Sequence, residues 1–163
     1  MNNQDLQHIG KDEAAFISIN LETYKRQFFQ LVSIVVVLIV MSYIIVNISR
    51  YDLSLFIIRR MAVPIMAVLA VLAFVHSFYR KRQLQRLDKM NSFDQKVQAY
   101  EKIYKFRLQW FVFSAGICCG LYVLSLHRLF LFFALFDLLL LIGNYPNKTI
   151  FKKELNHEDI IFY

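Results

Sequence analysis

Residues 79–109 read YRKRQLQRLDKMNSFDQKVQAYEKIYKFRLQ and separate two pairs of long apolar segments. This stretch, called the connector here, holds nine of the 19 Lys and Arg residues and carries a net charge of +6. On either side lie four windows almost free of charged residues, at 27–49, 61–79, 108–127 and 129–147. Each window has about the 20 residues that a helix needs to cross a bilayer. The sequence therefore predicts four membrane spans in two hairpins.

The composition supports the same conclusion. The chain has 163 residues, of which 58% are hydrophobic, and its mean hydropathy is +0.43. This exceeds what a soluble core of that size requires. In lipid, an open strand would leave backbone groups unpaired, so the Val-rich and Ile-rich windows are expected to be helices. The predicted fold class is all-α: a polytopic membrane protein with a basic, helical, cytoplasmic connector.

The expected division follows the apolar windows. It comprises an N-terminal segment (1–26), a first transmembrane hairpin (27–78), the connector (79–109), a second transmembrane hairpin (110–143) and a tail (144–163). On the side of both ends and the connector lie 15 Lys and Arg residues, and four lie on the other side. The positive-inside rule then places both ends in the cytoplasm, and we expect a bacterial inner (cytoplasmic) membrane. Because the net charge of +7 lies beside these windows, no nucleic-acid partner is expected.

The connector is predicted to form two helices. Ser92 and Gln95 match a capping box at the start of the second helix. After it, apolar and aromatic residues recur at spacings of three and four and so share one helical face. They are Phe93, Val97, Tyr100, Tyr104 and Leu108.

Two arrangements of these helices remain open. They can stand as an antiparallel hairpin, with Leu84 and Leu87 against Val97 and Tyr100. Alternatively, they lie on the membrane with four bases near anionic headgroups, each base contributing about 1 kcal/mol. These bases are Arg80, Lys81, Arg82 and Arg86, and lipid headgroups or a partner protein are their expected contacts.

The remaining segments carry weaker signals. The run 110–142 is too long for one crossing, so a tight turn is expected at residues 126–128. Residues 1–26 suggest a short interfacial helix or a disordered leader. The tail finishes with NHEDIIFY, and this ending docks on the chain's own connector, docks on a partner, or frays.

Asp137 is the one ionisable residue deep within a predicted span. A carboxylate there costs about 2.5–3.5 kcal/mol on insertion scales and normally faces other helices or a water-filled cavity. Two interpretations remain. Asp137 has a structural or assembly role, or it takes part in moving an ion, a proton or a substrate.

Small residues in the third window suggest close helix packing. Ser114, Gly116 and Gly120 lie at a depth similar to that of Asp137, and the two glycines form a GxxxG pattern. The pattern serves packing within the chain or dimerisation. Cys118 and Cys119 are expected to be buried filler, because no metal-binding spacing surrounds them. Neither a metal nor another cofactor is expected.

No motif in the chain names a reaction. The expected function is that of a non-enzymatic integral membrane protein, an accessory or assembly component of a membrane complex. Besides the lipid bilayer, its expected partners are membrane or cytoplasmic proteins that contact the connector and the tail. The alternative is a small oligomeric transporter or ion-coupled carrier that uses Asp137. A homo-oligomer is left open.

Overall fold

The computed structural model describes residues 18–48, 60–87, 89–90, 92–155 and 161–162. These residues form five helices: α1 (Leu21–Ile48), α3 (Ala62–Leu87), α4 (Phe93–Ser125), α5 (Arg128–Gly143) and α6 (Lys148–Leu155). In this part of the chain the predicted all-helical fold is interrupted only by two short strands, β1 (Ser18–Ile19) and β2 (Ile161–Phe162). The strands pair in parallel, with Ser18 opposite Ile161. The expectations for residues 1–17 lie outside the described residues.

Three helices, α1, α3 and α4, are long and apolar enough to cross a membrane. The helix α5 has 16 residues, so it spans only about 24 Å, less than the roughly 30 Å hydrocarbon layer. It qualifies as a span only together with α6, and the two are bent by 81°. The fourth window is therefore not one straight helix. Pro146 lies in the break, where its missing N–H interrupts no helical hydrogen bond.

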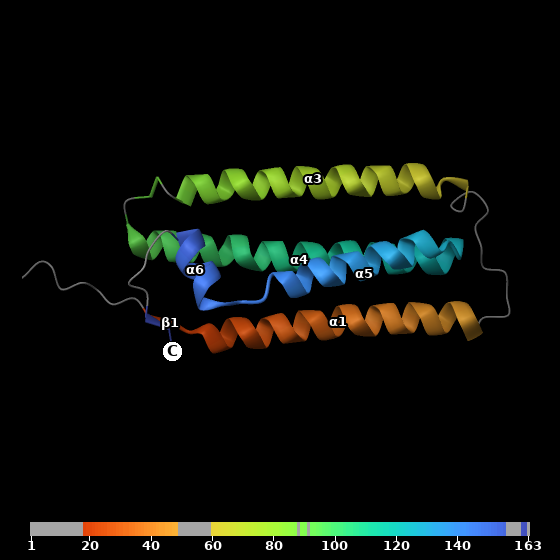
Figure 1. The fold of residues 1–163 in the computed structure, drawn as a ribbon, viewed down its shortest axis with the longest axis horizontal. Coiled ribbons are helices and arrows are strands. Elements are labelled where there is room, and N and C mark those ends of the chain that lie inside the picture. Colours follow the sequence, from red (N-terminus) through yellow and green to blue (C-terminus); the bar gives the residue numbers. More distant parts are fainter. Residues whose placement is uncertain (1–17, 49–59, 88, 91, 156–160, 163) are drawn as a thin grey trace, which may run out of the picture.

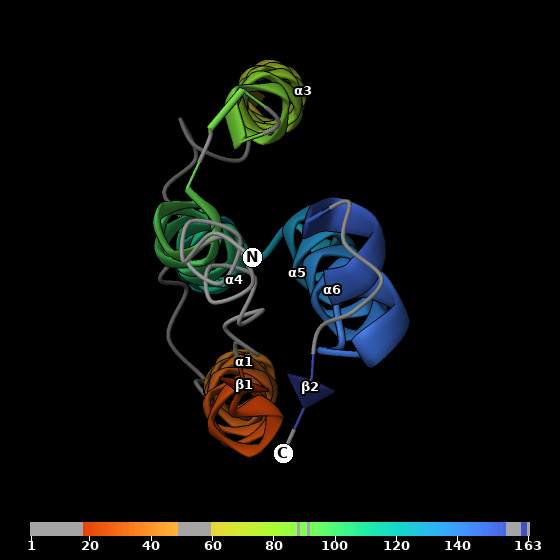
Figure 2. The ribbon, with the colours of Figure 1, turned by 90° about the vertical axis from the view of Figure 1, so that its left-hand side faces the viewer.

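The long helices lie side by side (Figure 1). Viewed from the end, α4 lies between α1 and α3, and α5 packs beside α4 and α1 (Figure 2). The short α6 lies at the end of the molecule where α3 finishes and α4 starts (Figure 1). This layout leaves α3 outside the group formed by α1, α4 and α5.

The connector is built from the ends of two long helices. The helix α3 continues past Tyr79 to Leu87, and α4 starts at Phe93. Leu87 and Tyr100 belong to one buried cluster, against which Leu84 and Val97 pack. Of the two arrangements left open by the sequence, the chain forms the antiparallel hairpin.

The predicted capping box is wrong in one respect. Ser92 is the N-cap residue of α4, but its side chain makes no capping hydrogen bond. Instead, the Lys96 N–H donates to the Ser92 backbone carbonyl at 3.1 Å, as the first helical bond requires. The helix thus starts where the sequence predicts without the side-chain interaction, which contributes only about 1 kcal/mol in typical caps.

The turn between α4 and α5 confirms the tight connection expected at residues 126–128. Leu126 has φ 56°, in the left-handed region that a non-glycine residue seldom adopts, and its N–H donates to the Tyr122 carbonyl at 2.8 Å. Nδ1 of His127 accepts from the Leu129 N–H at 3.4 Å. Both helix ends are therefore capped within a two-residue link.

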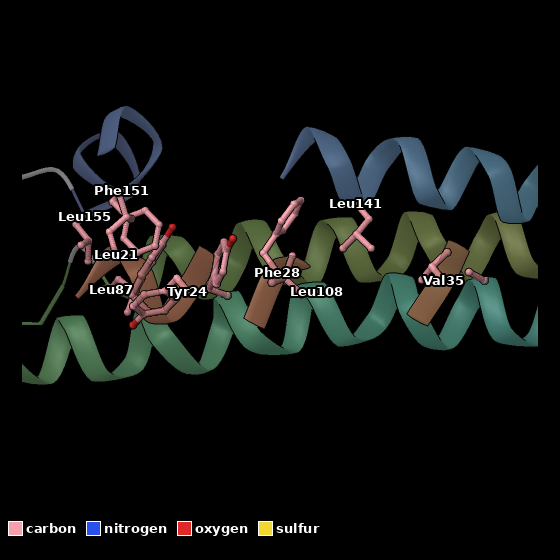
Figure 3. Close-up of a cluster of buried hydrophobic side chains, with 12 residues drawn as sticks. Leu21, Tyr24, Phe28, Val35, Leu87, Leu108, Leu141, Phe151 and Leu155 are labelled. Atoms are coloured by element: carbon pink, nitrogen blue, oxygen red, sulfur yellow. The ribbon is translucent and has the colours of Figure 1, made fainter. Parts of the chain in front are cut away.

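The main core joins α1, α4 and α6 (Figure 3). Tyr100, Tyr104 and Leu108 are each at most 2% exposed, and Val97 packs beside them, which confirms this part of the predicted apolar face of α4. The side chain of Phe93 lies outside what the structure describes. Phe151 and Leu155, both fully buried, pack on this face from α6. The start of the tail therefore docks on the chain's own connector, whereas the expectation for the ending NHEDIIFY falls largely on residues 156–160 and 163, outside the described ranges.

Candidate functional site

A cluster of three polar residues fixes α6 to α4. Arg107 Nη1 donates to Glu154 Oε1 at 3.0 Å, and the Tyr100 hydroxyl donates to Glu154 Oε2 at 2.6 Å. The Arg107 and Glu154 side chains are 5% and 20% exposed. Tyr100 lies in the connector, and its pKa is raised mainly by burial and secondly by the charge of Glu154. The Tyr100 hydroxyl therefore stays protonated and donates its hydrogen bond. We call Tyr100, Arg107 and Glu154 the tail cluster.

Aromatic rings surround the tail cluster. The Phe151 ring centroid lies 5.2 Å from that of Tyr24 and 5.2 Å from that of Tyr100. Tyr104 stacks near them, at 5.6 Å from Phe151, and its hydroxyl donates to the Asn144 carbonyl at 3.0 Å. Edge-to-face rings at such distances add about 0.5–1.5 kcal/mol each beyond area burial. The docking of α6 is thus both apolar and hydrogen-bonded.

Asp137 is buried, at 8% exposure, on α5. Its carboxyl group lies close to the Ser114 side chain and to Cys118, as antiparallel pairing of the last two spans predicts. The second oxygen, Oδ2, is buried with no hydrogen-bond partner within the described residues. Whether Asp137 moves an ion or only supports assembly stays a prediction.

A groove opens between α3, α4 and α5, with a volume of about 390 Å³. Four buried side-chain atoms without a hydrogen-bond partner are found in the described part of the chain, and all four belong to residues that line this groove. They are Nε2 of His76, Nε of Arg80, Nε of Arg107 and Oδ2 of Asp137. More than 90% of buried polar groups in proteins are bonded, so this concentration identifies the groove as a candidate site.

A second cavity, which we call the chamber, continues from the groove toward α6. It has a volume of about 540 Å³ and shares Arg80, Arg107 and Asn144 with the groove. Lys81 and Lys153 add two further positive charges to its wall. Among the described residues that line it, Glu154 is the sole acid, and both of its oxygens are already bonded. The chamber is therefore strongly cationic.

The structure divides the four bases that the sequence groups together. Arg80 and Lys81 line the chamber, whereas Arg82 and Arg86 are exposed and line neither cavity. The Arg82 guanidinium lies 4.7 Å from the centroid of the Phe78 ring. The sequence alone does not predict this division, because it depends on which side of α3 faces α4.

The two predicted packing glycines have more space around them than a close helix contact requires. A Cβ built at Gly116 would meet Leu38 Cδ1 at 3.9 Å, an ordinary contact, and one at Gly120 would meet nothing within 4 Å. The small residues that are buried in this region lie beside the two glycines. They are Ala115, Cys118 and Cys119 on α4, and Ala134 on α5. The packing role of Ser114, Gly116 and Gly120, including dimerisation, stays a prediction.

The thiols lie in this packed region. Cys118 and Cys119 are free and buried, and Cys119 is also close to Ser42 of α1. Across the described ranges, no three His, Cys, Asp or Glu side chains cluster as metal ligands would.

Three site residues escape the sequence analysis. His76 stacks on Trp110 with ring centroids 4.6 Å apart, at the mouth of the groove. Arg107 follows Tyr104 by three residues and so lies beside the apolar face of α4. A charged residue at that position indicates a buried polar contact, and this signal was present in the sequence. Glu154 gives no such signal, because its partners lie 47 and 54 residues earlier in the chain.

The site combines cationic donors at one end with a mostly apolar groove at the other. Such an arrangement can hold water, an anion or an amphiphile, and it places Asp137 at the inner end. No protein-family model, curated protein or solved structure matches this chain.

Proposed function

We propose that this chain is a non-enzymatic integral membrane protein, an accessory or assembly component of a membrane complex. The observation that supports this most is the loose attachment of α3. Its buried residues are Ala62, Met66 and Leu87, and none of the 20 residues from 67 to 86 is buried. By contrast, α1 is buried at intervals along its length, from Leu21 to Ser42. A span held mainly at its two ends leaves a face for another membrane protein.

The proposed topology has four spans in two hairpins, with α5 as a short final span. The start of α1, the end of α3, the start of α4 and α6 lie at the same end of the molecule (Figure 1). That end holds the basic connector, which favours a cytoplasmic location under the positive-inside rule. The proposed setting is a bacterial inner membrane with both ends of the chain in the cytoplasm.

This topology is tested with single cysteines in a background where Cys118 and Cys119 are alanine. Arg82→Cys and Arg128→Cys put exposed thiols at opposite ends of the molecule. An impermeant maleimide added to intact cells should label Arg128→Cys alone, and Arg82→Cys only after lysis. Labelling of both in intact cells would contradict the proposed orientation.

The proposed partner surfaces differ between the connector and the tail. Because α6 packs on the connector, its buried residues Phe151 and Leu155 are occupied. The exposed bases Arg82 and Arg86 remain for cytoplasmic proteins. In the membrane, the outward face of α3 includes Phe74, which is 75% exposed.

A photo-crosslinking amino acid at Phe74 tests the assembly role. The matched control carries the same amino acid at Val37 of α1, which is 58% exposed. We expect a discrete protein adduct in native membranes from position 74 and lipid adducts from position 37. If both positions give only lipid adducts, α3 has no protein partner and the proposal is wrong.

One observation favours the carrier alternative. Asp137 lines a groove that shares three lining residues with a cationic chamber at the proposed cytoplasmic end, and its Oδ2 has no hydrogen-bond partner among the described residues. Four spans leave little room for a private pathway, so this function requires an oligomer. Proton and solute flux in liposomes should fall in Asp137→Asn. Equal flux in the wild type and the variant would show that the carrier hypothesis is wrong.

A further inference from the structure

The three residues shared by the groove and the chamber lie at one level of the molecule. Arg80 directly follows the second apolar window, Arg107 directly precedes the third, and Asn144 follows α5. This is the level at which apolar helix meets charged connector, and in a membrane it coincides with the headgroups. Asp137 lies seven residues before Asn144, about 10 Å deeper along α5.

The two cavities differ in chemistry on either side of this level. The chamber presents the side chains of Arg80, Lys81 and Lys153 in addition to Arg107. The groove below is walled by apolar residues from two helices that contact each other little. They include Leu69, Ala70 and Ala73 of α3 and Phe133, Phe136 and Leu140 of α5.

From this juxtaposition we propose that the protein binds one anionic phospholipid between α3 and α5. The phosphate lies in the chamber beside Arg80 and Lys81, and an acyl chain follows the groove toward the membrane interior. This site goes beyond the assembly function and does not depend on it.

Charge and hydrogen bonding both support this ligand. Nε of Arg80 and Nε of Arg107 are buried donors that find no partner in the part of the chain that the structure describes, and Arg107 as a residue is only 4% exposed. Phosphate oxygens accept such bonds, and Arg is well suited to phosphate recognition. Basic pockets between membrane helices on the cytoplasmic side are a recognised form of anionic lipid site. A phospholipid also supplies the apolar chain that a free phosphate lacks.

Trp110 makes the proposal directly measurable. It is the only tryptophan in the chain, and it lines the groove. Bromine atoms on an acyl chain quench a nearby indole, so Trp110 fluorescence reports a chain in the groove. The probe is phosphatidylglycerol with brominated chains, titrated into the full-length protein in nanodiscs. Phosphatidylcholine with the same brominated chains is the control for non-specific lipid contact.

The expected result is selective quenching. Arg80, Lys81 and Lys153 each change affinity about fivefold, so phosphatidylglycerol should half-quench Trp110 at roughly 125-fold lower content than phosphatidylcholine. Arg80→Gln with Lys81→Gln should remove most of this preference. The charge-matched control, Arg82→Gln with Arg86→Gln, should retain it. Lys153→Gln should weaken the preference for phosphatidylglycerol about fivefold. This single variant replaces the Arg80→Gln with Lys81→Gln variant as the test if that double variant does not fold.

Three results would overturn the proposal. Equal quenching by the two lipids in wild type would show that the groove selects no headgroup. Equal losses in the two double variants would show a diffuse charge effect instead of a site. Removal of the preference by millimolar inorganic phosphate, with no change in maximal quenching, would show that the chamber takes phosphate and not a lipid.

Discussion

Two polar regions of this molecule meet at Arg107, and they differ in how completely their buried groups are hydrogen-bonded. In the tail cluster, both oxygens of Glu154 accept bonds, from Tyr100 and from Arg107 Nη1. In the groove, Arg107 Nε, Arg80 Nε, His76 Nε2 and Asp137 Oδ2 have no partner within the described residues. A buried group without a partner costs about 1–3 kcal/mol. Glu154 is thus fully hydrogen-bonded within the chain, whereas the groove is suited to a ligand or water.

Phe151→Ala tests the completeness of the docked tail and has the largest expected effect. Loss of a fully buried phenylalanine costs about 3–5 kcal/mol, because transfer and cavity terms add. We expect α6 to leave the connector, so that trypsin cleaves after Lys152 and Lys153 in folded protein. The matched control is Phe74→Ala, at a position 75% exposed, which should leave cleavage unchanged. Similar cleavage in the two variants would contradict the packing.

Glu154→Ala sharpens the comparison on its polar side. It leaves the Arg107 guanidinium buried without its counter-charge, which costs about 3 kcal/mol. The control is Glu101→Ala, which removes an exposed pair with Lys105, with side chains 39% and 43% exposed. That pair contributes about 0.5 kcal/mol or less. Thermal denaturation in detergent measures both, and equal shifts would mean that the tail cluster is not a buried ion pair.

Asp137→Leu has the smallest expected effect, and of opposite sign. Oδ2 of Asp137 is buried with no partner within the described residues, and replacing such a carboxyl group by an apolar side chain is nearly neutral or stabilising. The adjoining groove has room for the added volume. We expect the free energy of unfolding to rise by about 1 kcal/mol in thermal denaturation. A loss as large as that in Glu154→Ala would show that Asp137 is bonded as fully as Glu154.

Local patterns in the sequence predict the helices and one of their faces. The spacing of Val97, Tyr100, Tyr104 and Leu108 defines the face of α4 that the structure buries, because one helix alone fixes that geometry. The turn at residues 126–128 follows from length, since 33 apolar residues exceed one crossing. The burial of Asp137 near Ser114 follows from that turn, because antiparallel helices match residues at similar depth.

The groove itself depends on how helices pack, which no local pattern specifies. The separation of Arg80 and Lys81 from Arg82 and Arg86 requires the rotation of α3 about its own axis. The bond between Arg107 and Glu154 joins residues 47 positions apart. The bend after Gly143 arises because α5 ends there and α6 packs on Tyr24 and Tyr104 instead of extending the span.

The parallel pairing of β1 with β2 has a consequence for biosynthesis. Ser18 and Ile19 precede all five described helices, and their partners Ile161 and Phe162 follow them, so the pair closes only after these helices have been translated. In the proposed four-span topology, a chain whose last apolar segment inserted in the wrong direction would deliver α6 and β2 to the opposite compartment. There they would meet neither β1 nor Tyr24. Closure of this pair would therefore occur only in chains whose last apolar segment had inserted in the proposed direction.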